Sequence, residues 1–233
     1  MKLKVRRLSA VVFALVGVLV WLFVNPESYE QEYIKAENAE TESETMLATT
    51  ALELLDVKGR APKTGYNRDE FYPGWPTVDG CNLRQTIIKR EFGDSAVLNG
   101  CNVIAGEYDE PYTGEHMVFS SQEQISKGVQ IDHVVALSDA WQKGAQYLDY
   151  DTRNKIATDP LNLLAVDATA NEKKSDSDAA TWLPSNKKFR CQYVARQVSV
   201  KYKYKLWVTE AEKDAISRVL QQCPNQTTTG IAE

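Results

Sequence analysis

Five polar residues in the second half of the chain have the types and spacing needed to bind a cation and move a proton. Asp132 and His133 are adjacent, and Asn162, Asn171 and Lys174 follow them. Carboxylate and amide oxygens suit Mg²⁺, which keeps several waters and needs few protein ligands. Histidine is the side chain best suited to accept a proton near neutral pH. The pattern therefore predicts a divalent-cation site at Asp132 and Asn171, with His133 as a general base.

The elements around these residues should bring them together. Residues 130–137 form a β-rich run that contains the Asp-His pair, and a second apolar run covers residues 161–166. The segment Thr-Ala-Asn-Glu at 169–172 has the pattern of a capping box, which predicts a helix beginning there. In the run 138–142, Ser138 is expected to cap another helix. A hairpin followed by a helix can place Asp132 beside Asn171.

The two histidines of the chain lie in different settings. His116 follows the turn residues 111–114, which predicts a surface or structural role. His133 lies inside a β-rich run, where a lone Asp-His pair would carry little weight. Its assignment as the base depends on the two asparagines that follow, Asn162 and Asn171.

Basic residues supply the remaining requirement, contact with a phosphate. Lys174 lies three residues beyond Asn171 on the same predicted helix face, and Lys173 flanks it. We expect both lysines to contact substrate. Arg84 could reach the site or pair with a surface carboxylate, and for the lysines of 201–205 a solvated helix face is the favoured interpretation. The formal net charge of −5 means that any polyanion contact must come from a local patch.

At this point two segments, IDHVVALSDAW and DPLNLLAVDATANEKKSD, resemble the HNH endonucleases of the ββα-metal class. The likeness is to exported bacterial HNH-family proteins with a DHVVALSDAW core. It extends to GYNRDEFYPGWPTVDGCNLR, PYTG and ATWLPSNKKFRCQYVARQVSVKYKYKLWVT, and so covers nearly all of residues 65–220. The implied fold is α+β, a ββα-metal core with additional helices that is stabilised by disulfides.

The resemblance also implies roles for individual residues. Asp132 and Asn171 would bind the metal, His133 would be the general base and Asn162 would brace the hairpin. The implied activity is hydrolysis of phosphodiester bonds in DNA, with RNA as a further substrate, and the implied cofactor is Mg²⁺ or Mn²⁺. One departure is the 28 residues between His133 and Asn162, more than in minimal HNH motifs. A helix near 138–146 is expected to fill this insertion.

The start of the chain predicts export. Lys and Arg residues at positions 2, 4, 6 and 7 precede a charge-free run from Leu8 to Val24. We interpret residues 1–25 as a signal peptide or an N-terminal membrane anchor, with contact to the membrane if the segment stays uncleaved. We expect an acidic linker over 26–60, the nuclease domain over 61–224 and a flexible tail over 225–233.

The cysteines fit an oxidising compartment. An even number of cysteines in an exported chain predicts disulfides, and the chain has four: Cys81, Cys101, Cys191 and Cys223. Of the three pairings that four cysteines allow, sequence proximity favours Cys81–Cys101 and Cys191–Cys223. A zinc site is the alternative, but no C-x-x-C or Cys/His spacing supports it.

Further elements follow from local patterns, and two other functions compete with the nuclease. The patterns predict helices over 82–92, 189–204 and 209–222, and strands over 102–104 and 116–119. One alternative is an exported interaction module with an HNH-like core and no activity. The other is a different hydrolase, which the lack of H-E-x-x-H and G-x-S-x-G motifs disfavours.

Overall fold

A computed structural model describes residues 46–230. The expected signal peptide or membrane anchor over residues 1–25 lies outside this range. The N-terminal half of the described chain contains α3 (Ala48–Glu53), η1 (Arg68–Glu70), β1 (Thr77–Val78), β2 (Cys81–Asn82), α4 (Leu83–Phe92), η2 (Gly93–Ser95), β3 (Val97–Asn99), β4 (Asn102–Asp109), β5 (His116–Phe119) and α5 (Gln122–Gly128). The C-terminal half contains β6 (Val129–His133), α6 (Leu137–Gln142), η3 (Ala145–Tyr147), α7 (Tyr150–Thr158), β7 (Leu163–Asp167), α8 (Ala168–Lys174), η4 (Lys187–Phe189), α9 (Arg190–Lys203) and α10 (Glu210–Leu220). The predicted α+β class is confirmed.

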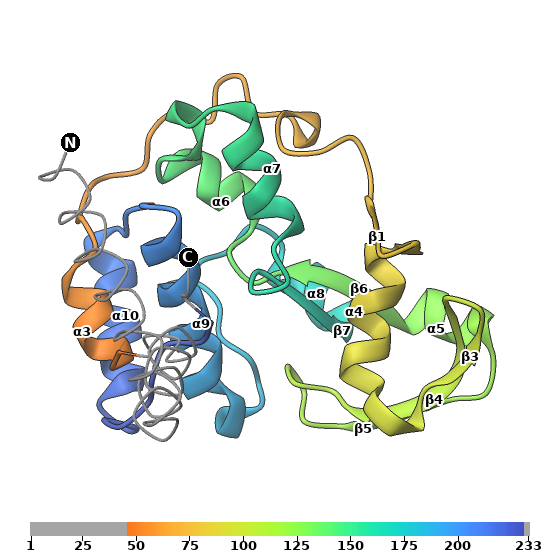
Figure 1. The fold of residues 1–233 in the computed structure, drawn as a ribbon. Helices are drawn as coiled ribbons and strands as arrows, with labels where there is room; N and C mark the ends of the chain where they lie inside the picture. The colour runs from red at the N-terminus through yellow and green to blue at the C-terminus, as the bar shows by residue number, and fades with distance from the viewer. Residues whose placement is uncertain (1–45, 231–233) are drawn as a thin grey trace, which may run out of the picture. The chain divides into compact units, whose positions relative to one another are not determined.

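The hairpin of β6 and β7 is the element that carries the site (Figure 1). The strands are antiparallel, with His133 opposite Leu163 and Asp132 opposite Leu164. Leu163 packs in a cluster with α4, whereas Leu164 packs in a cluster with α9. Since both faces of β7 are covered, the strand reads as a continuous apolar run and not as an alternating one. Helix α8 follows β7 directly, which gives the expected order of strand, strand and helix.

The ends of these elements differ from the sequence prediction. Strand β6 stops at His133, because the next two backbone N–H groups donate to Asn162. The Val134 N–H donates to the Asn162 carbonyl oxygen at 2.9 Å, and the Val135 N–H donates to the Asn162 side chain at 2.8 Å. Ser138 does not cap α6, because the N-cap of this helix is Ala136. The Ser138 hydroxyl instead donates to Asp176. Helix α8 begins before the predicted capping box, since the Asp167 side chain accepts from the backbone of its first turn.

Helices α6 and α7 occupy the long connection between β6 and β7; α6 corresponds to the helix expected near 138–146, whereas α7 was not expected. They share a core cluster with an irregular segment, residues 66–75, through Phe71, Trp141 and Ile156. The Nε of Arg153 on α7 also donates to the Glu70 carbonyl oxygen at 2.8 Å. The insertion therefore holds residues 66–75 against the hairpin.

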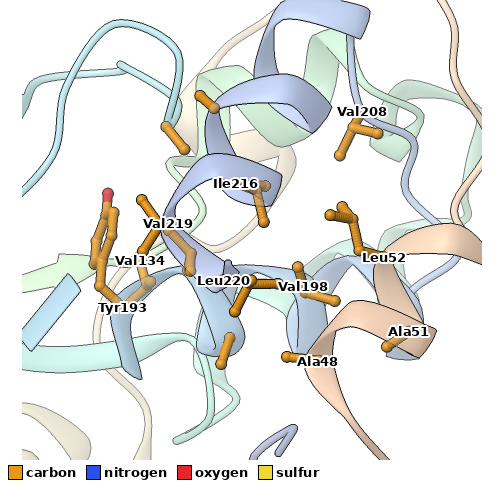
Figure 2. Close-up of a cluster of buried hydrophobic side chains, with 14 of the residues drawn as sticks. Ala48, Ala51, Leu52, Val134, Tyr193, Val198, Val208, Ile216, Val219 and Leu220 are labelled. Atoms are coloured by element: carbon orange, nitrogen blue, oxygen red, sulfur yellow. The ribbon is translucent and has the colours of Figure 1, made fainter. Parts of the chain in front are cut away.

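Helices α3, α9 and α10 surround the largest core cluster. In Figure 2 the side chains of Leu52, Val198 and Ile216 come from three different helices and point toward one another. Helix α3 belongs to the segment 26–60, which we expected to be an acidic linker. The alanine and leucine side chains of α3 are buried, so the folded unit includes α3 and does not begin at residue 61.

Residues 228 and 229 also contact the rest of the fold. Residues 225–233 were expected to form a flexible tail, but Thr228 is buried and its backbone N–H donates to the Met46 carbonyl oxygen at 2.8 Å. The Thr229 N–H donates to the Ser199 hydroxyl of α9 at 2.9 Å. The part of this segment up to residue 230 therefore closes over α3 and α9.

A second sheet of β3, β4 and β5 packs on α4 and α5. The predicted strand over 116–119 matches β5, whereas β4 is longer than the predicted 102–104. Gly106 is required in β4, since its φ is 147° and an added Cβ would lie 2.6 Å from the Phe92 ring. This contact lets α4 approach the sheet closely.

Both predicted disulfides are present, and the described residues contain no free cysteine. Cys81–Cys101 joins β2 to the start of β4. Cys191–Cys223 joins the first turn of α9 to the residues after α10, as the sequence predicted. Between residues 46 and 230, no helix has both the length and the apolar character needed to cross a membrane.

Candidate active site

A cavity of about 300 Å³ lies at the end of β6. Three of the predicted site residues, Asp132, His133 and Asn171, line it. Its other walls come from residues 66–68, the start of α6 and the residues after α8: Tyr66, Arg68, Ala136, Leu137, Ser138, Ser175 and Asp176, together with Ile131. The structure thus brings the expected base and both expected metal ligands to one cavity.

The imidazole of His133 is fixed by stacking and by one hydrogen bond. It lies parallel to the Trp75 ring at 5.9 Å between centroids and 5.9 Å from the Tyr72 ring. Its Nε2 lies 2.9 Å from the Ala157 carbonyl oxygen. Because a carbonyl oxygen only accepts, Nε2 carries the proton, and Nδ1 has the free lone pair. Burial lowers the His133 pKa to about 3, so the ring is neutral at neutral pH.

The carboxylate of Asp132 is buried and held by two groups. Lys174 Nζ lies 2.9 Å from Oδ1, and the Tyr112 hydroxyl donates to Oδ2. Burial raises the Asp132 pKa, while the charge of Lys174 and the hydrogen bond from Tyr112 oppose this rise. Each carboxylate oxygen has two lone pairs, so both oxygens keep capacity for a further contact.

The side chain of Asn171 is oriented by Gln130 of β6. Asn171 Nδ2 donates to Gln130 Oε1 at 2.8 Å, and no group within residues 46–230 donates to its Oδ1. The amide oxygen is therefore available in the cavity that Asp132 also lines. Within the described part of the chain, no three His, Cys, Asp or Glu residues are grouped to hold a metal. The oxygens of Asp132 and Asn171 fit a sparse site for a hard cation that keeps its waters.

Asn162 braces the hairpin from outside the cavity. It is fully buried; its Nδ2 donates to the Ile156 carbonyl oxygen at 3.0 Å and to that of Val135 at 3.3 Å. With the bond from the Val135 N–H, these contacts tie α7 to the chain after β6. This geometry orients the backbone around His133 without contact to a bound group.

Comparison with known proteins identifies the family of this chain. Residues 82–219 match the family model described as GmrSD restriction endonucleases, C-terminal domain. The chain belongs to this family. A relative from Arthroderma benhamiae, described as an uncharacterized secreted protein, is 36% identical over 182 residues, which cover 76% of this chain and 86% of the relative. No solved structure matches.

The match to the GmrSD C-terminal domain family supports a nuclease-like function. It includes Asp132, His133, Asn162 and Asn171, and it leaves out residues 66–75. The relative is fungal, so the bacterial part of the resemblance receives no support from it.

The structure corrects the expected role of Lys174. We expected this lysine to contact a phosphate, but it is fully buried and its Nζ contacts Asp132 Oδ1 and the His133 carbonyl oxygen, each at 2.9 Å. Lys174 lies in the last turn of α8, four residues after the buried Ala170, so its side chain is on the helix face toward the hairpin. Its contacts position Asp132.

Arg84 and Lys173, which we expected to contact nucleic acid, lie outside the cavity. Arg84 Nη2 donates to the Val129 carbonyl oxygen at 2.8 Å, which joins α4 to β6 and matches neither of the two open interpretations. Lys173 is exposed in the last turn of α8 and does not line the cavity. Lys201, expected on a solvated face, is fully buried.

Four residues of the site were missed by the sequence analysis: Tyr112, Arg68, Tyr72 and Trp75. The last three belong to GYNRDEFYPGW, whose four aromatic residues favour packing but do not show which element they pack against. His116 is exposed and its Nδ1 lies 2.8 Å from Asp109 Oδ1. This hydrogen bond raises the His116 pKa, and its place on β5 fits the expected surface role.

Proposed function

We propose that this protein is a metal-dependent HNH-type endonuclease that hydrolyses phosphodiester bonds of DNA, with RNA as a further substrate. One observation carries the proposal. His133 donates from Nε2 to Ala157, which leaves Nδ1 as a base beside a cavity that Asp132 and Asn171 also line. The family match and the fold order of β6, β7 and α8 support it.

In the proposed reaction His133 accepts a proton at Nδ1 from the attacking water. The water oxygen forms a bond to phosphorus, the bond from phosphorus to the leaving oxygen breaks, and the leaving alkoxide takes a proton from solvent. The hydrogen bond to Ala157 fixes the tautomer, and stacking on Trp75 fixes the plane of the ring. An anionic phosphate in the cavity acts against the lowered pKa of His133, because a negative charge favours the protonated ring.

Asp132 and Asn171 would hold the cation, Mg²⁺ or Mn²⁺. Once bound, this ion offsets the negative charge that develops on the phosphate oxygens. Lys174 and Tyr112 keep the Asp132 carboxylate in one orientation. The proposed location is outside the cytoplasm, supported by the secreted relative and by the two disulfides.

The test is cleavage of plasmid DNA and of RNA by the full oxidised chain in Mg²⁺, Mn²⁺ or EDTA. We expect cleavage with either metal and none in EDTA. Asp132→Ala and Asn171→Ala should raise the Mg²⁺ concentration needed for half-maximal activity. Asp214→Ala, which removes an exposed carboxylate on α10, is the matched control. Full activity in EDTA would remove the mechanism, and binding without cleavage in any metal would favour an inactive interaction module.

A further inference from the structure

The charges around the cavity are unevenly distributed. Among the described residues that line it, two are carboxylates, Asp132 and Asp176, and one, Arg68, carries a positive charge, since the His133 ring is neutral. Asp176 already accepts from Ser138 at 3.0 Å and pairs with Lys63 at 3.1 Å. A phosphodiester is an anion, so a cavity that accepts one needs a cation that is free to contact it.

Arg68 differs in its partners from five other arginines of the described chain. Arg60, Arg90 and Arg153 each pair with a carboxylate. Arg84 and Arg196 donate to backbone carbonyl oxygens. Arg68 is exposed and forms no ion pair with any residue in the range 46–230; its polar contact is a hydrogen bond from Nη2 to the Tyr72 hydroxyl at 2.6 Å.

The contacts of Arg68 hold its guanidinium near the base. Its Cζ lies 5.3 Å from the centre of the Tyr72 ring, and the same ring lies 5.9 Å from the ring of His133. One donor is used on Tyr72, so most of the five N–H donors of the guanidinium are free for a phosphate.

The segment that carries Arg68 is anchored to the insertion between the two strands. Arg153 pairs with Glu70 at 3.0 Å, and Asn154 Nδ2 donates to the Phe71 carbonyl oxygen at 3.1 Å. Both anchoring side chains belong to α7. The long connection from His133 to Asn162 therefore has a use in the site, because it supports the segment that presents Arg68.

We propose that Arg68 is a catalytic residue that binds the non-bridging oxygens of the scissile phosphate and stabilises their charge during hydrolysis. This inference rests on the proposed nuclease function. It concerns a residue outside the range 82–219 that matches the family. A guanidinium fits the role because it can contact two phosphate oxygens at once through parallel N–H groups.

The test uses the full oxidised chain and a short DNA duplex, with kcat and KM measured in Mg²⁺. Arg68→Ala should lower kcat/KM by at least ~10²-fold, the low end for loss of a donor to the transition state. Arg68→Lys should recover part of this loss, and millimolar guanidinium chloride should partly rescue Arg68→Ala. Arg218→Ala is the matched control, since it removes an exposed arginine on α10 and should leave kcat/KM unchanged.

A binding measurement separates failure of this inference from failure of the nuclease proposal. In EDTA, Arg68→Ala should weaken binding of the same duplex by several-fold relative to wild type and Arg218→Ala. If wild type cleaves and Arg68→Ala cleaves equally well, the role of Arg68 is wrong while the nuclease function stands. If wild type does not cleave, the nuclease function fails, and equal affinity of Arg68→Ala and wild type then removes Arg68 as a phosphate-binding residue. Equal losses in Arg68→Ala and Arg218→Ala would indicate a general charge effect and also overturn the inference.

Discussion

Buried lysines occur in two regions of this protein, and the regions differ in their access to solvent. The first, the closed ion cluster, connects α6, α9, α10 and two segments outside the helices. Its members are Arg60, Asp139, Lys143, Asp178, Lys201 and Glu212. The second, the cleft pair, consists of Asp132 and Lys174, and Asp132 lines the cavity. Both regions remove charges from water, which is costly unless the charges are paired.

In the closed ion cluster the charges satisfy one another. Lys143 is fully buried and lies 2.6–2.7 Å from carboxylates of Asp139, Asp178 and Glu212. Three cations face three carboxylates, and of these six side chains only Arg60, which is 36% exposed, reaches solvent. In the cleft pair, by contrast, Asp132 borders a space that a cation or a substrate can enter. The same chemical pair thus serves packing in one region and a binding site in the other, and position relative to the cavity decides which.

The largest expected effect is in the closed ion cluster. Lys143→Met should lower the free energy of unfolding by about 3–5 kcal/mol, because it leaves three buried carboxylates with only two cations, Arg60 and Lys201. Urea unfolding measures this. The control is Lys127→Met, which removes an exposed pair with Glu123 and should cost less than ~1 kcal/mol. Equal effects of the two substitutions would contradict the distinction.

The next largest effect is expected from removal of the disulfide that joins α9 to the residues after α10. Cys223→Ser should lower the free energy of unfolding by about 2–4 kcal/mol while leaving kcat unchanged in the folded protein, since neither cysteine lines the cavity. Cys191→Ser should have the same effect. Peptide mapping without reductant should find no free thiol, and a Cys81–Cys191 linkage would contradict the structure.

Removal of the lysine of the cleft pair should lower activity more than it lowers stability. Lys174→Met should cost only about 1–3 kcal/mol of stability, because Asp132 borders the cavity and water can reach it. Its kcat should fall by at least ~10-fold, since the carboxylate loses its fixed orientation. In the comparison with Lys143→Met, activity per folded molecule is the deciding measurement. If Lys143→Met lowers it as much as Lys174→Met does, the two regions do not differ in function.

A smaller effect should depend on pH. Burial acts to raise the pKa of Asp178, but Lys143 and Arg60 outweigh it and lower this pKa to about 2. A carboxyl group with a lowered pKa in the folded state stabilises it above the ordinary pKa and loses this contribution as pH falls through the lowered one. Asp178→Asn should therefore be less stable than wild type at pH 7, by on the order of 2 kcal/mol. The difference should shrink as pH falls from 4 toward 2, and a constant difference would contradict the ionised state.

Local patterns were sufficient to predict the elements of the site. The helix over 82–92 and the strand over 116–119 follow from periodicity and turn residues, and their observed bounds differ by one residue or none. The disulfides followed from proximity in the sequence. The order of β6, β7 and α8 was visible because each element carries its own signal, either an apolar run or residues that cap a helix.

Contacts between distant residues were not predictable in this way. The segment 66–75 has no regular period, and Tyr72 meets His133 only because α7 supports the segment. The buried lysines could have been found from spacing, since Lys201 lies four residues after Gln197 and Lys174 four after Ala170, both buried. We assigned these lysines to solvent or substrate because charged side chains are rarely buried without partners, and the partners lie on other elements.

Substitution of the two histidines tests directly whether His133 is the general base. His133→Ala and His116→Ala are compared for cleavage of one DNA substrate in saturating Mg²⁺, with thermal unfolding measured on both. We predict that His133→Ala lowers kcat by at least ~10²-fold in a folded protein, while His116→Ala, at an exposed position of β5, keeps wild-type activity. Wild-type cleavage by His133→Ala together with loss in His116→Ala would contradict it.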